Sequence, residues 1–278
     1  MFQYDYLFDS HSHLSTIEGD TTDLVHQATS AGVMKIVDIA NDVASTKKVL
    51  ALHQMFPEIV LPTAGIHPEL AVPGSDLYFD GMNETIIRKQ VSLLDEIILS
   101  NPNKFIMIGE TGLDYYWLEK STLSQAEIDK SKELQKILFE AQLLLALKHN
   151  LLVSVHARSS HQDCIQLVKK YPDVKGIFHS FAGRLEEAKE IFDLGYAVGI
   201  NGIITYKSAQ VLRETILSLT EGKDIRVPSD LYACNIYLET DSPFLIPSKA
   251  LTIFSFVNSF LQFGHLIVVS SFISKLPK

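Results

Sequence analysis

Histidine and acidic residues recur along this chain in patterns that suit the binding of divalent metal ions. His11 and His13 are separated by one residue, so in an extended segment both imidazoles point to the same face and can reach one ion. Further candidate groups each follow an apolar run, namely His67, Glu110, His156, His179 and Asp241. A single histidine in such a place is more often structural. The joint pattern predicts a metal site, because imidazoles and carboxylates gathered without cations would be electrostatically costly.

The remaining histidines do not share this placement. Four of them fall on predicted helices or helix ends, where we expect surface or structural roles: His26, His53, His149 and His161. The last, His265, belongs to an unusual C-terminal tail.

Eight short apolar or β-branched runs alternate with longer helix-like segments. The runs span residues 6–8, 35–39, 59–63, 105–108, 151–155, 176–178, 195–200 and 235–238. Apolar residues recur at helical spacing most clearly over 126–149, and helices are also predicted over 21–31, 185–192 and 209–219. This alternation predicts an α/β fold, a (β/α)8 TIM barrel with its helices outside. The carboxyl ends of all the strands meet at one face of such a barrel, so the candidate ligands converge there, beneath a predicted loop over 71–82.

The overall composition excludes several classes of protein. The chain has 278 residues, of which 46% are apolar and 21% charged, as in soluble globular proteins. Asp and Glu outnumber Lys and Arg by 33 to 24, which excludes a protein that coats nucleic acid by positive charge alone. The two cysteines, Cys164 and Cys234, provide no disulfide framework. With no visible secretory signal, we expect a cytoplasmic location, with the nucleus as the alternative.

The C-terminal segment is atypical, because residues 250–274 include no Asp, Glu, Lys or Arg. Its apolar runs are long enough to span a bilayer but are interrupted by polar residues. We favour a buried helix or strand pair over a membrane anchor, and an alternative end joined to a known domain is a third reading. The predicted division is a barrel over 1–248 and a tail over 249–278.

Taken in order, the motifs around the candidate ligands closely resemble the TatD-like metal-dependent deoxyribonucleases, a TIM-barrel branch of the amidohydrolase superfamily. The motifs are Asp9-Ser10-His11-Ser12-His13, Gly65-Ile66-His67-Pro68, Gly109-Glu110-Thr111-Gly112, Val155-His156-Ala157-Arg158, Phe178-His179-Ser180-Phe181 and Glu239-Thr240-Asp241-Ser242-Pro243. The resemblance implies that one divalent ion is surrounded by His11, His13, Glu110 and Asp241. It implies that a second is surrounded by Glu110, His156 and His179. It also implies that His67 and Arg158 lie close to the scissile phosphate.

The function implied is hydrolysis of DNA phosphodiester bonds, with exonuclease action on single-stranded ends favoured. Two divalent ions, Mg²⁺, Mn²⁺ or Zn²⁺, would activate the attacking water. Asp241 is the expected general base, and the other expected catalytic residues are Glu110, His67 and Arg158. We expect Asp9 and Asp114 to orient ligands or pack the strand ends. Three aromatic residues either stack a base or pack beneath a loop, and both readings stay open: Tyr115, Tyr116 and Trp117. No obligate protein partner is indicated.

Two alternatives stay open. One is an enzyme of the same superfamily that cleaves another ester or amide bond, although amide-cleaving relatives often carry a carboxylated lysine where this chain has Glu110. The other is a catalytically impaired variant with an altered C-terminus. After Pro243 the sequence departs from the family pattern, which usually continues into an Arg-x-Asn-x-Pro segment and charged helices. We therefore expect a barrel that could be distorted or incompletely closed at its C-terminal end.

Overall fold

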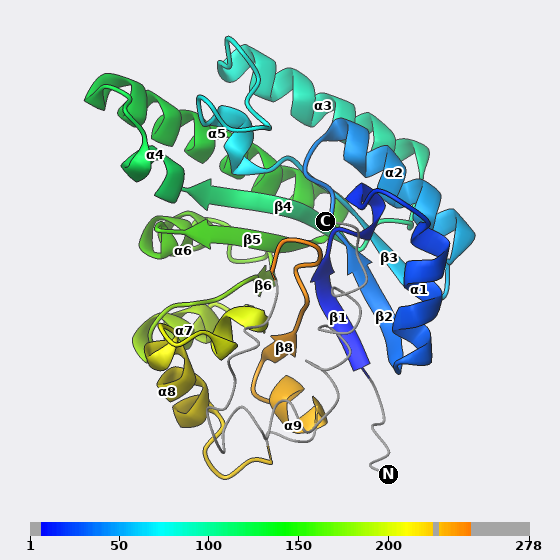
Figure 1. Cartoon of the computed structure of the whole chain (residues 1–278). Helices are drawn as coiled ribbons and strands as arrows, with labels where there is room; N and C mark the ends of the chain where they lie inside the picture. Colours follow the sequence, from blue (N-terminus) through cyan, green and yellow to red (C-terminus); the bar gives the residue numbers. More distant parts are fainter. Residues whose placement is uncertain (1–6, 225–227, 246–278) are drawn as a thin grey trace.

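The computed structural model describes residues 7–224 and 228–245 and contains eight parallel strands that follow one another around a barrel (Figure 1). Their bounds are β1 Leu7–Ser12, β2 Val33–Asp38, β3 Val60–Ala64, β4 Met107–Asp114, β5 Leu152–Arg158, β6 Gly176–Phe178, β7 Ala197–Ile200 and β8 Ile236–Leu238. The predicted (β/α)8 TIM barrel is confirmed. Three strands extend further than predicted, through the motifs themselves, so that His11, Glu110 and His156 lie inside β1, β4 and β5.

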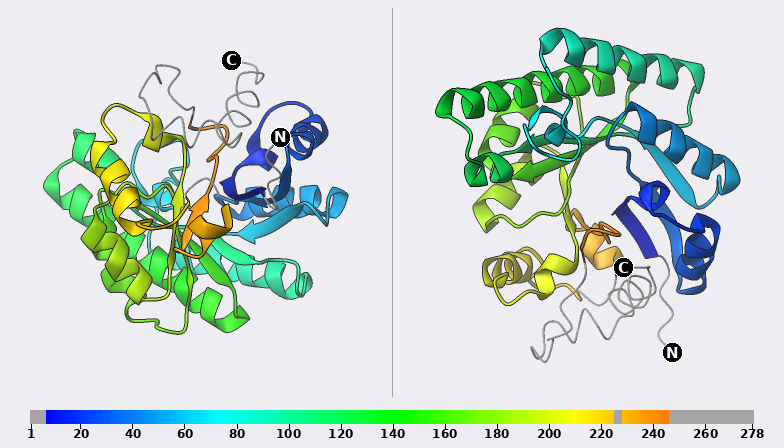
Figure 2. Two further views of the ribbon diagram at one scale, coloured as in Figure 1. Left: turned by 90° about the horizontal axis from the view of Figure 1, so that it is seen from below. Right: turned by 45° about the horizontal axis from the view of Figure 1, so that its top comes forward.

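Helices cover the outside of the barrel (Figure 2). They are α1 Thr21–Ser30, α2 Val43–Met55, α3 Glu84–Ser100, α4 Tyr116–Lys120, α5 Gln125–His149, α6 His161–Val168, α7 Leu185–Asp193, α8 Gln210–Leu219 and α9 Pro228–Tyr232, with short 3-10 helices η1 Leu14–Thr16, η2 Pro68–Ala71 and η3 Gly202–Thr205. The four helices predicted by range are confirmed to within one residue at each end. Capping residues define where two of these helices begin. The Asp20 side chain accepts backbone N–H groups at the start of α1, and Ser124 and Glu127 form a capping box at the start of α5.

Apolar side chains pack on both sides of the strands. The largest buried cluster joins the strands to the surrounding helices, from Ala64 to Ile236. A smaller cluster fills the barrel, because its members come from strands all around it: Phe8, Val37, Leu61, Met107, Ile177, Ala197 and Tyr237. This packed interior closes the barrel below the ligand-bearing strand ends.

The junction between β8 and β1 is the weakest part of the barrel wall. Strand pairing runs from β1 through to β8, but no ladder joins β8 to β1 within the described residues. Two backbone hydrogen bonds nevertheless cross this seam just beyond β8: the Asp241 N–H donates to the His11 carbonyl and the His13 N–H donates to the Ser242 carbonyl, both at 2.8 Å. The Thr240 hydroxyl also donates to Asp9 Oδ2 at 2.7 Å. The expectation of incomplete closure therefore holds for strand pairing, while polar contacts close the end that carries the site.

The C-terminal tail over 249–278, with its predicted boundary and its readings as a buried element or an anchor, lies outside the described residues. Within 7–224 and 228–245, no helix has both the length and the apolar character that a bilayer crossing requires.

Candidate active site

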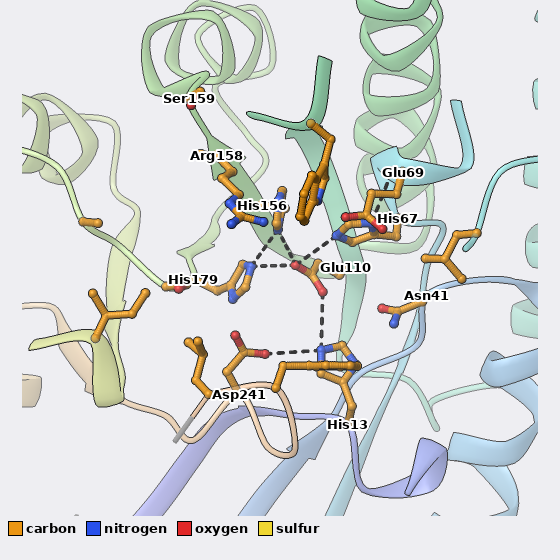
Figure 3. A pocket seen from close by; sticks show the side chains of 18 of the residues that line it. His13, Asn41, His67, Glu69, Glu110, His156, Arg158, Ser159, His179 and Asp241 are labelled. Atoms are coloured by element: carbon orange, nitrogen blue, oxygen red, sulfur yellow. Dashed lines mark hydrogen bonds and ion pairs between the residues drawn. The ribbon is translucent and has the colours of Figure 1, made fainter. Parts of the chain in front are cut away.

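A cavity of about 660 Å³ lies at the carboxyl ends of the strands and contains most of the predicted site (Figure 3). Seven predicted site residues line it: His13, His67, Glu110, His156, Arg158, His179 and Asp241. The eighth, His11, is fully buried directly beneath. All the residues that the sequence selected are thus brought together by the fold. The predicted loop over 71–82 contributes Asp76 and Leu77 to the cavity wall.

Two carboxylates face the imidazoles of His11 and His13, Asp241 from beyond β8 and Glu110 from β4, and we call these four side chains site A. The two imidazole Nε2 atoms of His11 and His13 are 3.2 Å apart. Glu110 Oε2 is 3.5 Å from each of them. Asp241 Oδ1 is 3.8 Å from His11 Nε2 and 3.5 Å from His13 Nε2. All four donors are buried or nearly so.

These separations fit a divalent ion. A tetrahedral centre with bonds of about 2.0–2.1 Å has ligand atoms about 3.4 Å apart, close to the separations among His11, His13 and Asp241, which form a group that could hold one ion. The two imidazole nitrogens face each other at 3.2 Å, and two carboxylates lie beside them. A divalent cation can bind all of these donor atoms at once, whereas a proton can be shared by only two of them. Site A therefore has the composition and spacing of a metal site.

A second donor set, site B, comprises Glu110, His156 and His179. Glu110 Oε1 lies 2.6 Å from His156 Nδ1 and 2.6 Å from His179 Nε2. The two imidazole nitrogens are 3.1 Å apart. Glu110 thus presents one oxygen to each site, and the ring of His179 stacks on that of His11 at a centroid distance of 3.9 Å.

The histidines of the two sites differ in protonation, and within site A burial acts to lower the pKa of His13 but the carboxylates of Asp241 and Glu110 raise it above its usual value. Burial, followed by the neighbouring His179, lowers the pKa of His11 to about 4, so that this imidazole is neutral at pH 7. Burial acts to raise the pKa of Glu110, but the surrounding imidazoles, His179 first, hold it well below its usual value. For His156 burial acts to lower the pKa, yet the carboxylates of Asp114 and Glu110 raise it to about 10. A cation at site B must therefore displace a proton from His156.

His67 differs from the other cavity histidines because its tautomer is fixed by the backbone. The N–H of Glu69 donates to His67 Nδ1 at 3.2 Å, so His67 acts as the N-cap of η2. A neutral imidazole that accepts at Nδ1 carries its proton on Nε2. The Nε2 of His67 lies 3.4 Å from Glu110 Oε1, near site B, but a protonated nitrogen donates a hydrogen bond rather than a metal bond. This geometry suits the predicted role of His67 beside an anion.

Side chains behind the imidazole rings of His156 and His11 fix the orientation of these two rings. Asp114 Oδ2 is 3.0 Å from His156 Nε2, which turns Nδ1 toward Glu110. The Ser154 hydroxyl is 3.1 Å from His11 Nδ1, which turns Nε2 toward site A. Such contacts raise the basicity of a ligand and hold its ring in place. Asp9 has the packing role that was expected, since it binds Thr240 across the seam.

Arg158 is held by aromatic stacking. Its guanidinium carbon lies 4.0 Å from the centroid of the Tyr116 ring and 5.2 Å from that of Trp117. No ion pair joins it to an acid within the residues that the structure describes, so its N–H donors are available to an anion in the cavity. The neighbouring aromatic residues have different environments. Tyr115 is buried and its hydroxyl donates to Asp163, whereas Trp117 is 45% exposed and lines the cavity.

Glycine lets the ligand-bearing strand ends approach closely. A Cβ on Gly65, after β3, would lie 2.3 Å from the carbonyl carbon of Gly109 in β4. Any larger residue at position 65 would push apart the segments that carry His67 and Glu110.

Three residues with a place in the site were missed by the sequence reasoning. His161 was expected to be a surface or structural residue, but it lines the cavity from the start of α6. Asn41 lines it beyond β2, and Glu239 lies beneath it, where its Oε1 accepts the Ser180 N–H at 2.6 Å. Each follows a barrel strand at its carboxyl end, which is the signal that would have selected them.

Comparisons with known proteins agree with the geometry. Residues 8–253 match the family described as TatD related DNase. An uncharacterized metal-dependent hydrolase of Haemophilus influenzae is 30% identical over 243 residues, which cover 86% of this chain and 81% of the relative. Human deoxyribonuclease TATDN3 is 29% identical over 245 residues, covering 87% and 80%. The crystal structure of YjjV, a TatD homolog from Escherichia coli K12, has the same fold, with a TM-score of 0.69, 24% identity and coverage of 96% and 90%.

Proposed function

The chain belongs to the TatD related DNase family, and from that premise we propose that it is a metal-dependent deoxyribonuclease that hydrolyses DNA phosphodiester bonds. We infer exonuclease-type action on strand ends. The observation that carries the proposal is the position of Glu110, whose two carboxylate oxygens face two donor sets at one cavity. A shared carboxylate of this kind suits two divalent ions about 3.5–4 Å apart.

The donor sets define which residues would hold the ions. His11, His13, Glu110 and Asp241 would hold one, and Glu110, His156 and His179 would hold the other. Mg²⁺, Mn²⁺ or Zn²⁺ is compatible with these nitrogen and oxygen ligands. When bound, such ions polarise phosphoryl oxygens and lower the pKa of water.

Asp241 is the proposed general base. Burial acts to raise the pKa of its carboxyl, but the hydrogen bond from His13 and the other nearby imidazoles bring it below its usual value. The group is therefore an ionised carboxylate at neutral pH, and it lines the cavity in which the phosphate would lie. It can accept the proton that the attacking water loses.

His67 and Arg158 are proposed to bind the phosphoryl oxygens. The protonated Nε2 of His67 and the planar fork of Arg158 both belong to the cavity wall, and each donates without accepting. Negative charge that develops on the phosphate during attack is stabilised by donors already in position. Local donors and ions thus offset the net charge of −9 that the whole chain carries.

The test combines metal analysis with cleavage. We expect two equivalents of metal per chain by elemental analysis, and Mg²⁺-, Mn²⁺- or Zn²⁺-dependent cleavage of DNA that a chelator stops. Glu110→Gln should remove at least one equivalent and lower cleavage by more than about 100-fold, because even the outer partners of metal ligands contribute 10–100-fold. Glu18→Gln, at an exposed acid, is the matched control. Cleavage that survives Glu110→Gln would overturn the proposal.

A further inference from the structure

Two aromatic side chains of the cavity wall are largely exposed. Trp117 is 45% exposed and Phe244 is 61% exposed, and both line the cavity described above. Two exposed rings that line one cavity, beside its imidazole and carboxylate side chains, offer flat apolar faces on which a ligand can stack. Phe79 is also 45% exposed but is not among the residues that line this cavity.

The two rings lie on opposite sides of the site. Trp117 belongs to α4, which follows β4, and Phe244 follows β8, four strands further around the barrel. The ring of Phe244 meets that of His13 edge-on, at a centroid distance of 5.0 Å and an angle of 74°. Trp117 lies beside Arg158. One ring thus adjoins site A, and the other adjoins a proposed phosphate donor.

Both rings are positioned before any ligand arrives. Trp117 packs edge-on against Tyr116 at 5.1 Å, and Tyr116 in turn carries the Arg158 guanidinium. The backbone N–H of Phe244 donates to the Asp241 carbonyl at 2.8 Å, in the turn that also places the Asp241 side chain. A preorganised ring loses little conformational freedom when a flat ligand stacks on it.

The side-chain charge of the cavity favours such stacking. Besides Glu110 and Asp241, its lining includes the acids Glu69 and Asp76. Arg158 is the only lysine or arginine among the described residues that line it. A polyanion is therefore gripped weakly by side-chain charge, whereas aromatic rings bind the faces of any base regardless of sequence.

We propose that Trp117 and Phe244 form an aromatic clamp that stacks the unpaired nucleobases on either side of the bound phosphate. This rests on the proposed function, because only a nucleic acid presents bases that flank a scissile phosphate. Stacking requires exposed base faces, so the clamp selects strand segments whose bases are not paired at the site. Trp117 and Phe244 are specificity residues in this scheme and take no part in bond cleavage.

The only tryptophan of the chain is Trp117, so intrinsic fluorescence reports on one side of the clamp directly. The metal-loaded full chain is titrated with a short phosphorothioate oligothymidylate and with an abasic phosphorothioate oligomer of the same length and charge. We expect saturable quenching by the first, no quenching by the second, and about 10-fold weaker binding of the abasic oligomer.

Variants test the second side of the clamp. Phe244→Ala keeps the Trp117 reporter and should weaken oligothymidylate binding by about 10-fold, while Phe79→Ala should leave it unchanged. Equal affinity for both oligomers without quenching, together with intact DNA cleavage by the unaltered chain, would overturn the clamp and leave the proposed function standing. Failure to bind either oligomer, together with no cleavage, would overturn both.

Discussion

At the scale of single residues, His11 and His156 are each oriented by a partner behind the imidazole ring, Ser154 and Asp114 respectively. His11 and His156 were predicted as ligands because they belong to recognisable motifs. Asp114 lies in a motif too, and its expected orienting role agrees with its contact to His156. Ser154 could not be predicted as the partner of His11, because nothing local indicates which serine of β5 meets a side chain of β1, 143 residues away.

The contact between Asp114 and His156 supports a prediction about metal affinity. Asp114→Asn keeps the shape of the side chain but removes the negative charge that makes His156 a better ligand. We expect metal affinity at site B, and cleavage with it, to fall by about 10–100-fold, as measured by competition with a chromophoric chelator.

The matched control for this variant is Asp95→Asn. Asp95 pairs with Lys148 and His149 between α3 and α5, remote from the cavity. The Asp95→Asn variant should leave metal affinity unchanged. Equal affinities of the two variants would show that Asp114 does not tune its histidine.

At the scale of elements, α5 shows where periodicity misleads. Its range was predicted from apolar residues at helical spacing over 126–149, yet Leu144 within that range is 50% exposed. Two glutamines at seven-residue spacing, Gln135 and Gln142, are fully buried instead. Gln142 accepts the Ile66 N–H at 2.8 Å and donates to the Ile66 carbonyl at 2.9 Å, and Gln135 binds the backbone of Asp114 in the same way. The two glutamine side chains point into the protein because the backbone N–H and carbonyl groups of Ile66 and Asp114, at irregular strand ends, need hydrogen-bond partners.

The Gln142 contacts predict a combined loss of stability and activity. Gln142→Leu would leave the buried N–H and carbonyl of Ile66 without partners, next to His67. We expect the free energy of unfolding to fall by about 2–3 kcal/mol in urea titration, with weaker cleavage. Gln125→Leu, at the exposed start of α5, should cost less than about 0.5 kcal/mol. Similar losses for both variants would contradict this role of Gln142.

At the scale of the whole molecule, the barrel was predictable from the alternation of eight apolar runs with helix-like segments, and six of those runs end in a motif that carries site residues. The missing β8–β1 ladder agrees with the expected incomplete closure, but the polar contacts that close the site end could not be predicted, since they are single hydrogen bonds between residues more than 200 positions apart. His13 and Asp241 provide two of them and also belong to site A. Metal binding and closure of the wall are therefore linked at the β1–β8 seam.

This linkage predicts a local response to metal removal. A ligand present at 100 times its dissociation constant stabilises a fold by about 2.7 kcal/mol, and a chelator should remove that contribution. Hydrogen exchange should then accelerate at the His13 and Asp241 amides, which bond across the seam. The Val153 amide, which bonds to the Lys175 carbonyl at 2.9 Å, should change little. Uniform acceleration at all three amides would contradict a seam-specific effect.

The β1–β8 seam also determines when site A can be completed during synthesis of the chain. During synthesis His11 and His13 leave the ribosome before strands β2 to β8, and Asp241 emerges only after all eight strands. The contact between Thr240 and Asp9 spans 231 residues, and contacts of such range form late in folding. A nascent chain that lacks β8 can gather the histidines of the first strand but cannot complete site A. The fold thus delays the completion of site A until nearly the whole barrel has been translated.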